Sequence, residues 1–145
     1  MKRLVLALIL APSLAAADIC GPLMRLVEHA RAGTLQAADP GLAASALSGE
    51  ATCGLAVEAA GEALFCYTAY PFRNGEAEVE AARVEAALLG CFEGGEVEVD
   101  AAVNHPDSYA ARSVAVEGAV VSLSVKDKGA LGRTLVFLRV GPGGE

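Results

Sequence analysis

Four cysteines constrain the fold of this chain more than any other feature of its sequence. They are Cys20, Cys53, Cys66 and Cys91, separated by 33, 13 and 25 positions. No two of them form the closely spaced Cys-x-x-Cys pair that is typical of structural zinc sites. In an exported chain, an even number of cysteines favours disulfides, and four cysteines allow three connectivities. The pairing therefore depends on the compartment and on the local pattern around each cysteine.

The first residues have the layout of a secretory signal peptide. Lys2 and Arg3 form a short positive region, which precedes the apolar run of residues 4–10. Residues 15–17 are alanines, the small side chains expected just before a cleavage site. The apolar stretch is too short for a spanning helix, which needs about 20 residues. We therefore expect residues 1–17 to be removed and the mature protein to be periplasmic or secreted.

Lipid anchoring and membrane insertion of the mature chain are not expected. Asp18 and Ile19 precede Cys20, whereas a lipidated cysteine directly follows a small residue. No later segment approaches membrane-spanning length. Loss of Lys2 and Arg3 would change the net charge from −7 to −9. This acidic balance argues against a nucleic-acid partner, because phosphate binding needs a basic surface.

The local pattern ranks the three disulfide connectivities. Residues 52–70 are typical of two short strands around a loop at residues 58–61. Pairing residues whose numbers sum to 119 places Cys53 opposite Cys66, at a separation that a disulfide can span. A two-residue turn at Gly61 and Glu62 would shift this register and remove the pairing. The hairpin thus predicts Cys53–Cys66, which leaves Cys20–Cys91 as the second disulfide.

Two helices are predicted from the spacing of apolar residues. The first covers residues 19–30 and ends near Gly33. The second covers about residues 75–92, with Asn74 as its N-cap. The apolar stripe of the second helix consists of Ala81, Val84, Leu88 and Cys91.

Glu76, Glu80 and Arg83 are predicted to lie largely off this stripe.

Because Cys20 opens the first helix and Cys91 closes the second, a disulfide between them favours an antiparallel arrangement of the helices.

The remaining segments complete a prediction of an α+β fold. Residues 38–51 read mostly as a loop, and an irregular stretch follows the second helix. Strands are predicted at 113–117, 119–125 and 134–140, with a flexible tail at 141–145. We therefore expect a single domain at 18–140 in which two helices pack on one face of an antiparallel sheet. The predicted order is α-β-β-α-β-β(-β), held by two disulfides.

The most polar segment raises the question of catalysis. Asn104, His105, Asp107 and Ser108 stand close together in the chain. Neighbours in one segment do not generally converge as nucleophile, base and orienting group. No Gly-x-Ser-x-Gly motif is present. The segment is therefore predicted to be a turn or a weak recognition loop, with no catalytic residue assigned.

An aromatic segment supplies the other candidate binding residues. On a strand, Phe65 and Tyr67 share one face, while Cys66, Thr68 and Tyr70 share the other. One set is expected in the core. The other is expected to be half-exposed, where Tyr67 or Tyr70 could contact a partner.

Charge is unevenly distributed, but it predicts no metal or cofactor site. Eight acidic residues and one arginine lie within residues 76–100, and five basic residues lie within 112–139. This pattern is typical of solvated surfaces, or of a polarity that steers a basic partner. The alternating acids of residues 96–100 lack the compact loop that calcium needs. His29 is expected to be a partly exposed helix residue.

The sequence favours an exported, non-catalytic protein-binding module, such as an inhibitor, an immunity-type protein or an accessory protein. Its partner is expected to be another exported protein. The alternative is a small exported hydrolase that uses His105 with an acid or hydroxyl from elsewhere in the chain. An exposed sheet face or aromatic patch would favour binding, and a cleft around His105 would favour the enzyme.

Overall fold

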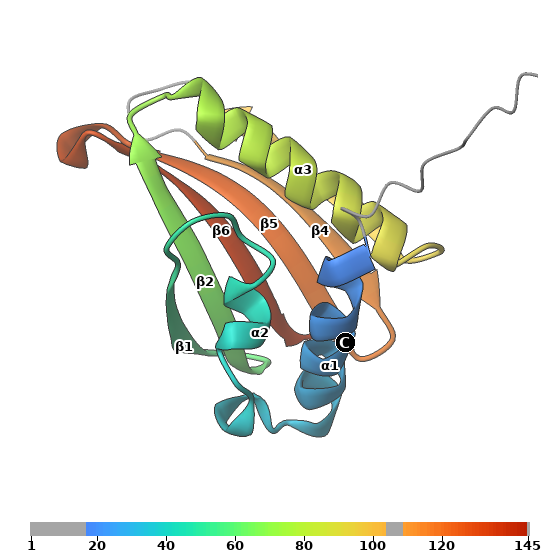
Figure 1. Ribbon diagram of the computed structural model, residues 1–145. Coiled ribbons are helices and arrows are strands. Elements are labelled where there is room, and N and C mark those ends of the chain that lie inside the picture. The colour runs from blue at the N-terminus through green and yellow to red at the C-terminus, as the bar shows by residue number, and fades with distance from the viewer. Residues whose placement is uncertain (1–16, 104–108, 145) are drawn as a thin grey trace, which may run out of the picture.

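The computed structural model describes residues 17–103 and 109–144. In these residues, helices and the strands of one large sheet follow one another along the chain (Figure 1). The helices are α1 (Ala17–Ala32), α2 (Gly41–Ala44) and α3 (Gly75–Cys91), with 3-10 turns at Leu35–Ala37 and Gly129–Leu131. The strands are β1 (Thr52–Glu58), β2 (Gly61–Pro71), β3 (Glu96–Val103), β4 (Tyr109–Val116), β5 (Ala119–Lys128) and β6 (Arg133–Pro142). The predicted signal peptide falls almost entirely outside these residues.

All the strands belong to one antiparallel sheet. Its spatial order is β1-β2-β6-β5-β4-β3, so β2 and β6 join the first hairpin to the later strands. Alternation along β5 shows how the sheet acquires two different faces. Val121 and Leu123 are buried, whereas Ser122 and Ser124 between them are only half-buried. Successive side chains of a strand point to opposite faces, so one face of the sheet forms the core.

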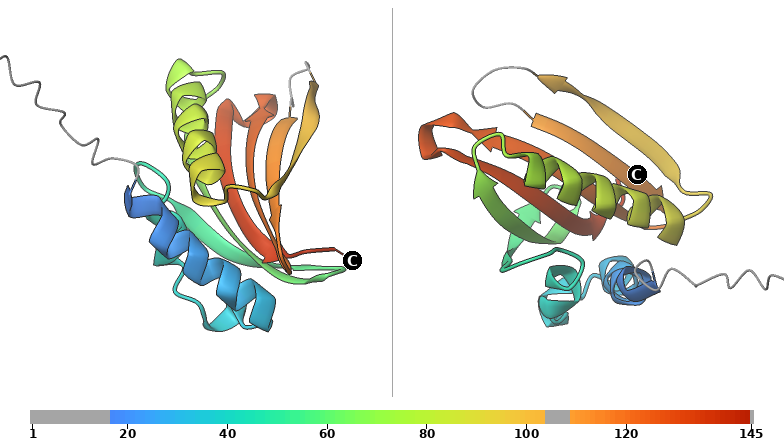
Figure 2. Two further views of the ribbon diagram at one scale, coloured as in Figure 1. Left: turned by 90° about the vertical axis from the view of Figure 1, so that its right-hand side faces the viewer. Right: turned by 45° about the horizontal axis from the view of Figure 1, so that its top comes forward.

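The helices lie on the same side of the sheet in all views (Figures 1 and 2). They cover the buried face with apolar side chains spaced at helical intervals, which pack against the inward-pointing residues of the strands. The fully or almost fully buried members of this core are Leu23 and Leu26 of α1, Val84 and Leu88 of α3, and Leu64, Val121, Val136, Leu138 and Val140 of the sheet.

Both predicted disulfides are confirmed. Cys53 pairs directly with Cys66 in the β1–β2 ladder, where residue numbers sum to 119. Because Glu58 pairs with Gly61, the turn is two residues long and is centred on residues 59–60, so the predicted register is kept. Cys20 in the first turn of α1 is bonded to Cys91, the last residue of α3, with 5.2 Å between their Cα atoms.

The predicted α+β class is confirmed in its coarse form, since helices, an antiparallel sheet and two disulfides are present. The chain is richer in strands than predicted, and its element order differs. Residues 38–51, predicted mostly as loop, include α2 and contribute Ala43, Ala46 and Leu47 to the core. The predicted irregular stretch contains β3, in which acids alternate with Val97 and Val99 as expected for a strand, although both valines remain exposed.

The predicted antiparallel pairing of the two main helices is wrong. Figure 1 shows α1 beginning where α3 ends, and the two helices cover different parts of the sheet. The Cys20–Cys91 disulfide joins them at this junction. A link between the start of one helix and the end of another fixes only that meeting point, because the helices can diverge from it at any angle.

Glu80 is also placed differently from the prediction. It faces inward with an exposed fraction of 5%. Its carboxylate accepts hydrogen bonds from Ser48 N at 2.6 Å and from Arg83 Nε at 2.9 Å. Arg83 also donates to Ala46 O at 2.8 Å. Burial alone raises the pKa of Glu80, but the bonds from Arg83 and Ser48 outweigh it, so its pKa lies below the ordinary value.

The last strand extends beyond the predicted domain end at residue 140. β6 runs to Pro142, and Gly141 is buried. Gly143 N then donates to Gly118 O at 3.2 Å, so the segment predicted as a flexible tail begins inside the sheet.

Candidate functional site

Figure 2 shows that one face of the sheet is turned away from the helices, and we call it the open face. On β2, β6 and β5 it carries the residues that alternate with the core positions. Their side chains are half-buried by one another rather than by a second layer. The main contributors are Phe65, Tyr67, Leu135, Phe137, Arg139, Ser122, Ser124 and Lys126.

Three aromatic side chains form a row on this face. Tyr67 on β2 is the direct register partner of Phe137 on β6, and their ring centroids lie 4.8 Å apart. Phe65, also on β2 and diagonally opposite, has its ring centroid 6.1 Å from that of Phe137. Cross-strand aromatic pairs stabilise antiparallel strands, which explains the close approach of these rings. We call Phe65, Tyr67 and Phe137 the aromatic row.

A glycine on β1 accommodates the end of this row. Gly54 pairs with Phe65, and a Cβ atom at position 54 would lie 2.8 Å from Cζ of the Phe65 ring. The tip of the ring therefore occupies the space that a side chain at position 54 would fill. Any larger residue at position 54 would push the ring away from the sheet.

Lys126 extends the aromatic row toward the centre of the sheet. Its ammonium nitrogen lies 4.3 Å from the Phe137 ring centroid and 5.7 Å from that of Tyr109. Burial lowers the pKa of Lys126, and the nearby charge of Lys128 lowers it further. No carboxylate in the described parts of the chain forms an ion pair with Lys126. A partly desolvated cation on aromatic rings can therefore still accept an anionic partner.

Charge changes sign across the open face. Arg139 on β6 donates from Nε to Glu58 Oε1 at 2.8 Å, and this bond holds the pKa of Glu58 below its ordinary value. Exposed Arg133 adds a second basic group on the same strand. At the opposite edge, β3 carries exposed acids. The acids of β3 that point to the open face are Glu96, Glu98 and Asp100, which pair with Ala115, Ser113 and Ala111 of β4.

Small side chains separate the two charged regions. Ser122 and Ser124 of β5 stand opposite Ser113 and Ala111 of β4. These residues project little above the backbone. A partner could therefore approach the middle of the sheet closely while contacting aromatic and basic groups on one side and acids on the other.

The predicted binding residues fall into separate places. Tyr67 lies in the aromatic row, but Tyr70 points to the helix side, as the alternation requires. Burial and the nearby Glu80 carboxylate raise the pKa of Tyr70. Asn104, His105, Asp107 and Ser108 lie outside the described residues.

Sequence reasoning missed most of the open face. Phe137, Lys126 and Arg139 come from the C-terminal hairpin, which was predicted without its pairing to β2. The available signal was alternation in residues 119–140, where polar and aromatic residues interleave with valine and leucine. The pairing of β2 with β6 is a long-range contact that this alternation alone does not specify.

The other histidine, His29, has a local structural partner. His29 Nδ1 lies 2.9 Å from Thr34 Oγ1, and Thr34 N donates to His29 O at the end of α1. Both residues line a surface cleft of about 660 Å³, together with Asp39, whose carboxylate accepts from Gly41 N. These bonds close the helix end and begin the next turn. Within the described ranges, no three His, Cys, Asp or Glu side chains form a metal-binding group.

The chain matches no protein-family model, and no curated protein matches it significantly. In the part of the chain that the structure describes, no helix has the length and apolar character needed to cross a bilayer. The two disulfides indicate an oxidising environment.

Proposed function

We propose that this protein is an exported, non-catalytic module that binds another exported protein through its open face. The observation that carries the proposal is the aromatic row with Lys126 seated on it, on a sheet face that no described helix covers. Aromatic side chains are enriched where proteins contact one another. Lys126 adds a cation held against two of the aromatic rings of this face. The signal-like N-terminal segment and the two disulfides support export to the periplasm or beyond.

The partner surface is an acidic and apolar strip. Its apolar side chains would cover Phe65, Tyr67 and Phe137, and its carboxylates would pair with Lys126 and Arg133. Lys126 has already lost part of its hydration in the unbound protein, so pairing costs less additional desolvation there than at a fully solvated lysine. Charge complementarity of this kind fixes orientation and speeds association.

The acidic β3 edge sets the orientation of the partner. An acidic strip laid over Glu96, Glu98 and Asp100 would meet like charges, whereas the same strip laid over the aromatic row would meet Lys126. Like-charge contacts disfavour the reversed arrangement. The partner is therefore expected to bind toward β2 and β6.

Capture from the exported fraction tests the proposal. Oxidised protein is immobilised, and bound proteins are identified by mass spectrometry at low and high salt. We expect a protein with an acidic binding region to be retained by the wild type and lost with Phe137→Ser or Lys126→Glu. The matched control is Val79→Ser, which alters an apolar side chain on α3 with an exposed fraction of 71%.

Three results would overturn the proposal. One is equal retention by Phe137→Ser and the wild type, and another is loss of retention with Val79→Ser alone. The third is turnover of an ester, peptide or glycoside that disappears with His105→Ala while the melting temperature stays the same. That last result would establish the hydrolase alternative.

A further inference from the structure

The edge of β2 is only partly covered by β1. The β1–β2 ladder ends at the pair Thr52 and Tyr67, whereas β2 continues to Pro71. On its other side, β2 remains paired with β6 as far as Pro71 and Arg133. In the described chain, Thr68–Pro71 therefore have a strand neighbour on one side only.

The direction of the backbone groups on this edge follows from the ladder. Phe72 N donates to Gly132 O, which places the even-numbered residues of β2 in hydrogen-bonded pairs with β6. Hydrogen-bonded and non-hydrogen-bonded pairs alternate in antiparallel sheets. Both the N–H and the C=O of Ala69 consequently point away from β6, and no described backbone group bonds to either.

A cleft of about 680 Å³ lies along this edge. Tyr67 lines it from the open face and Tyr70 from the helix face, while Pro71 closes its end. The Pro71 carbonyl accepts from Asn74 N at 3.1 Å, so Ala69 supplies the available backbone pair. The other lining residues are Ser48, Gly49, Glu50, Thr52, Thr68, Glu76 and Arg133.

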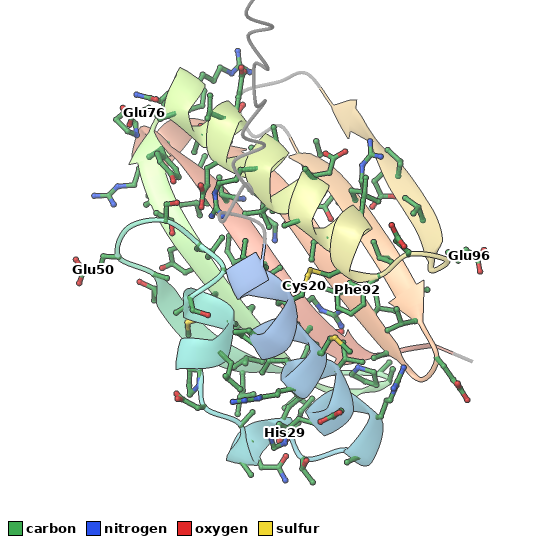
Figure 3. The ribbon with its side chains drawn as sticks, turned by 45° about the vertical axis from the view of Figure 1, so that its right-hand side comes forward. Cys20, His29, Glu50, Glu76, Phe92 and Glu96 are labelled. Carbon is green, nitrogen blue, oxygen red and sulfur yellow. A yellow bond between two sulfur atoms is a disulfide. The ribbon has the colours of Figure 1, made fainter. Side chains whose placement is uncertain are left out.

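Acidic side chains flank the cleft where the helices meet this edge. Figure 3 shows Glu50 on the loop before β1 and Glu76 at the start of α3, on the same side of the molecule. Both are exposed. Burial raises the pKa of Glu80, one turn further along α3, but the bonds from Arg83 and Ser48 bring it below the ordinary value. Burial and the Glu80 carboxylate raise the pKa of Tyr70 in the cleft. Arg133 lines the cleft from the open face instead, because it alternates with buried Thr134.

We propose that this cleft binds an extended, basic segment of a partner protein as an added strand beside β2. The incoming residue opposite Ala69 exchanges two backbone hydrogen bonds with it, and its side chain lies on the open face near Tyr67. The residues before and after it point to the helix face, toward Tyr70, Glu50 and Glu76. A lysine or arginine at these positions lies next to Glu50 and Glu76, which we call the acidic rim of the cleft.

This site is independent of the proposed use of the open face. Strand addition depends on the Ala69 backbone and on the acidic rim, whereas docking on the open face depends on Phe137 and Lys126. A single partner could use both, since Tyr67 borders each. The experiments below change the edge without changing the aromatic row.

The first test uses a defined peptide and nuclear magnetic resonance of the ¹⁵N-labelled, oxidised protein. The probe is acetyl-Thr-Lys-Val-Lys-Thr-amide, which places lysines on both sides of a central valine. We expect saturable shifts centred on the amide of Ala69 and slower hydrogen exchange there. The same peptide with glutamate in place of lysine should bind more weakly, because it faces Glu50 and Glu76.

Removal of one backbone donor distinguishes strand addition from simple charge attraction. N-methylation of the central valine keeps both lysines but removes the N–H that would donate to Ala69 O. Loss of that hydrogen bond should weaken binding by about fivefold or more. Unchanged affinity of the N-methyl peptide, or stronger binding of the glutamate peptide, would overturn the proposal.

The matched protein variants are Ala69→Pro and Ala69→Val. Proline removes the outward N–H while the β2–β6 bonds remain, as is tolerated on strand edges. Valine keeps the donor. We expect Ala69→Pro to lose peptide binding and Ala69→Val to retain it, with both folded by circular dichroism and both still retaining the partner of the open face. The amide chemical shift of Ala69 is also measured at several protein concentrations in the absence of peptide. If it changes with concentration, the edge pairs with a second copy of the chain, and this result would contradict the proposal.

Discussion

The two faces of one strand, β6, show how this molecule divides stability from recognition. Val136, Leu138 and Val140 point to the helices and are fully buried. Phe137 and Arg139, which alternate with them, point to the open face and remain half-buried. Only the helix side of the strand has a second layer to pack against. Burial on the helix side therefore stabilises the fold, and area left on the open face is available for a partner.

The two disulfides also differ in where they lie relative to the buried face and in the length of chain that they enclose. Cys20–Cys91 joins the two helices that cover the buried face, and 71 positions separate its cysteines. Cys53–Cys66 links neighbouring strands at the sheet margin across 13 positions. In the chain-entropy model, the disulfide that closes the longer loop removes more conformational entropy from the unfolded chain and therefore stabilises the fold more.

The largest effect is expected from removing the helix-layer disulfide. Cys20→Ala with Cys91→Ala should lower the free energy of unfolding by about 4 kcal/mol, compared with about 3 kcal/mol for Cys53→Ala with Cys66→Ala. Urea unfolding of the oxidised proteins measures both values. A greater loss from the hairpin pair would show that the sheet margin, rather than the helix layer, limits stability.

Adjacent residues of β6 give the next largest contrast. Leu138→Ala removes a fully buried side chain and should cost about 3 kcal/mol of unfolding free energy. Phe137→Ala removes a half-buried ring and should cost about 1 kcal/mol, mainly through its aromatic contacts. Equal costs measured by urea denaturation would contradict the division between the faces.

The buried carboxylate beneath α3 should give a pH-dependent effect. Glu80→Gln weakens the bonds from Ser48 and Arg83 and should cost about 2 kcal/mol at pH 7. The pKa of Glu80 is lowered in the fold, so its stabilising charge is fully present above its unfolded pKa, near 4.5. That contribution is lost as pH falls through the lower folded pKa.

Urea midpoints of the wild type and Glu80→Gln should therefore converge at acidic pH. Glu78→Gln, which changes an exposed carboxylate of the same helix, is the control. A Glu80→Gln difference that persists below the folded pKa would show that shape, rather than charge, supplies the effect.

The smallest effect is expected from the open-face cation. Lys126→Ala should change the free energy of unfolding by less than about 1 kcal/mol, because a cation–π contact and partial desolvation offset each other. Differential scanning calorimetry measures it against Lys128→Ala. A loss comparable with that of Leu138→Ala would mean that Lys126 supports the fold rather than a partner.

Local patterns predicted the elements that depend on local chemistry. The Asn74 cap is confirmed, since its side chain accepts from Glu76 N, and the Cys53–Cys66 register follows from alternation in one hairpin. Placement of Glu80 in the core could not be predicted, because its partner amide at Ser48 lies 32 positions away. The aromatic row likewise depends on pairing of β2 with β6 across most of the domain.

Site-specific photocrosslinking tests directly whether the open face is the binding surface. A photoreactive phenylalanine analogue replaces Phe137 or Ser124 on the open face, or Val79 on α3, in cells that export the protein. We expect Phe137 and Ser124 to crosslink to the same exported protein, through a region rich in aspartate and glutamate, and Val79 not to do so. Crosslinks to that protein from Val79 alone, or none from either open-face position, would contradict this expectation.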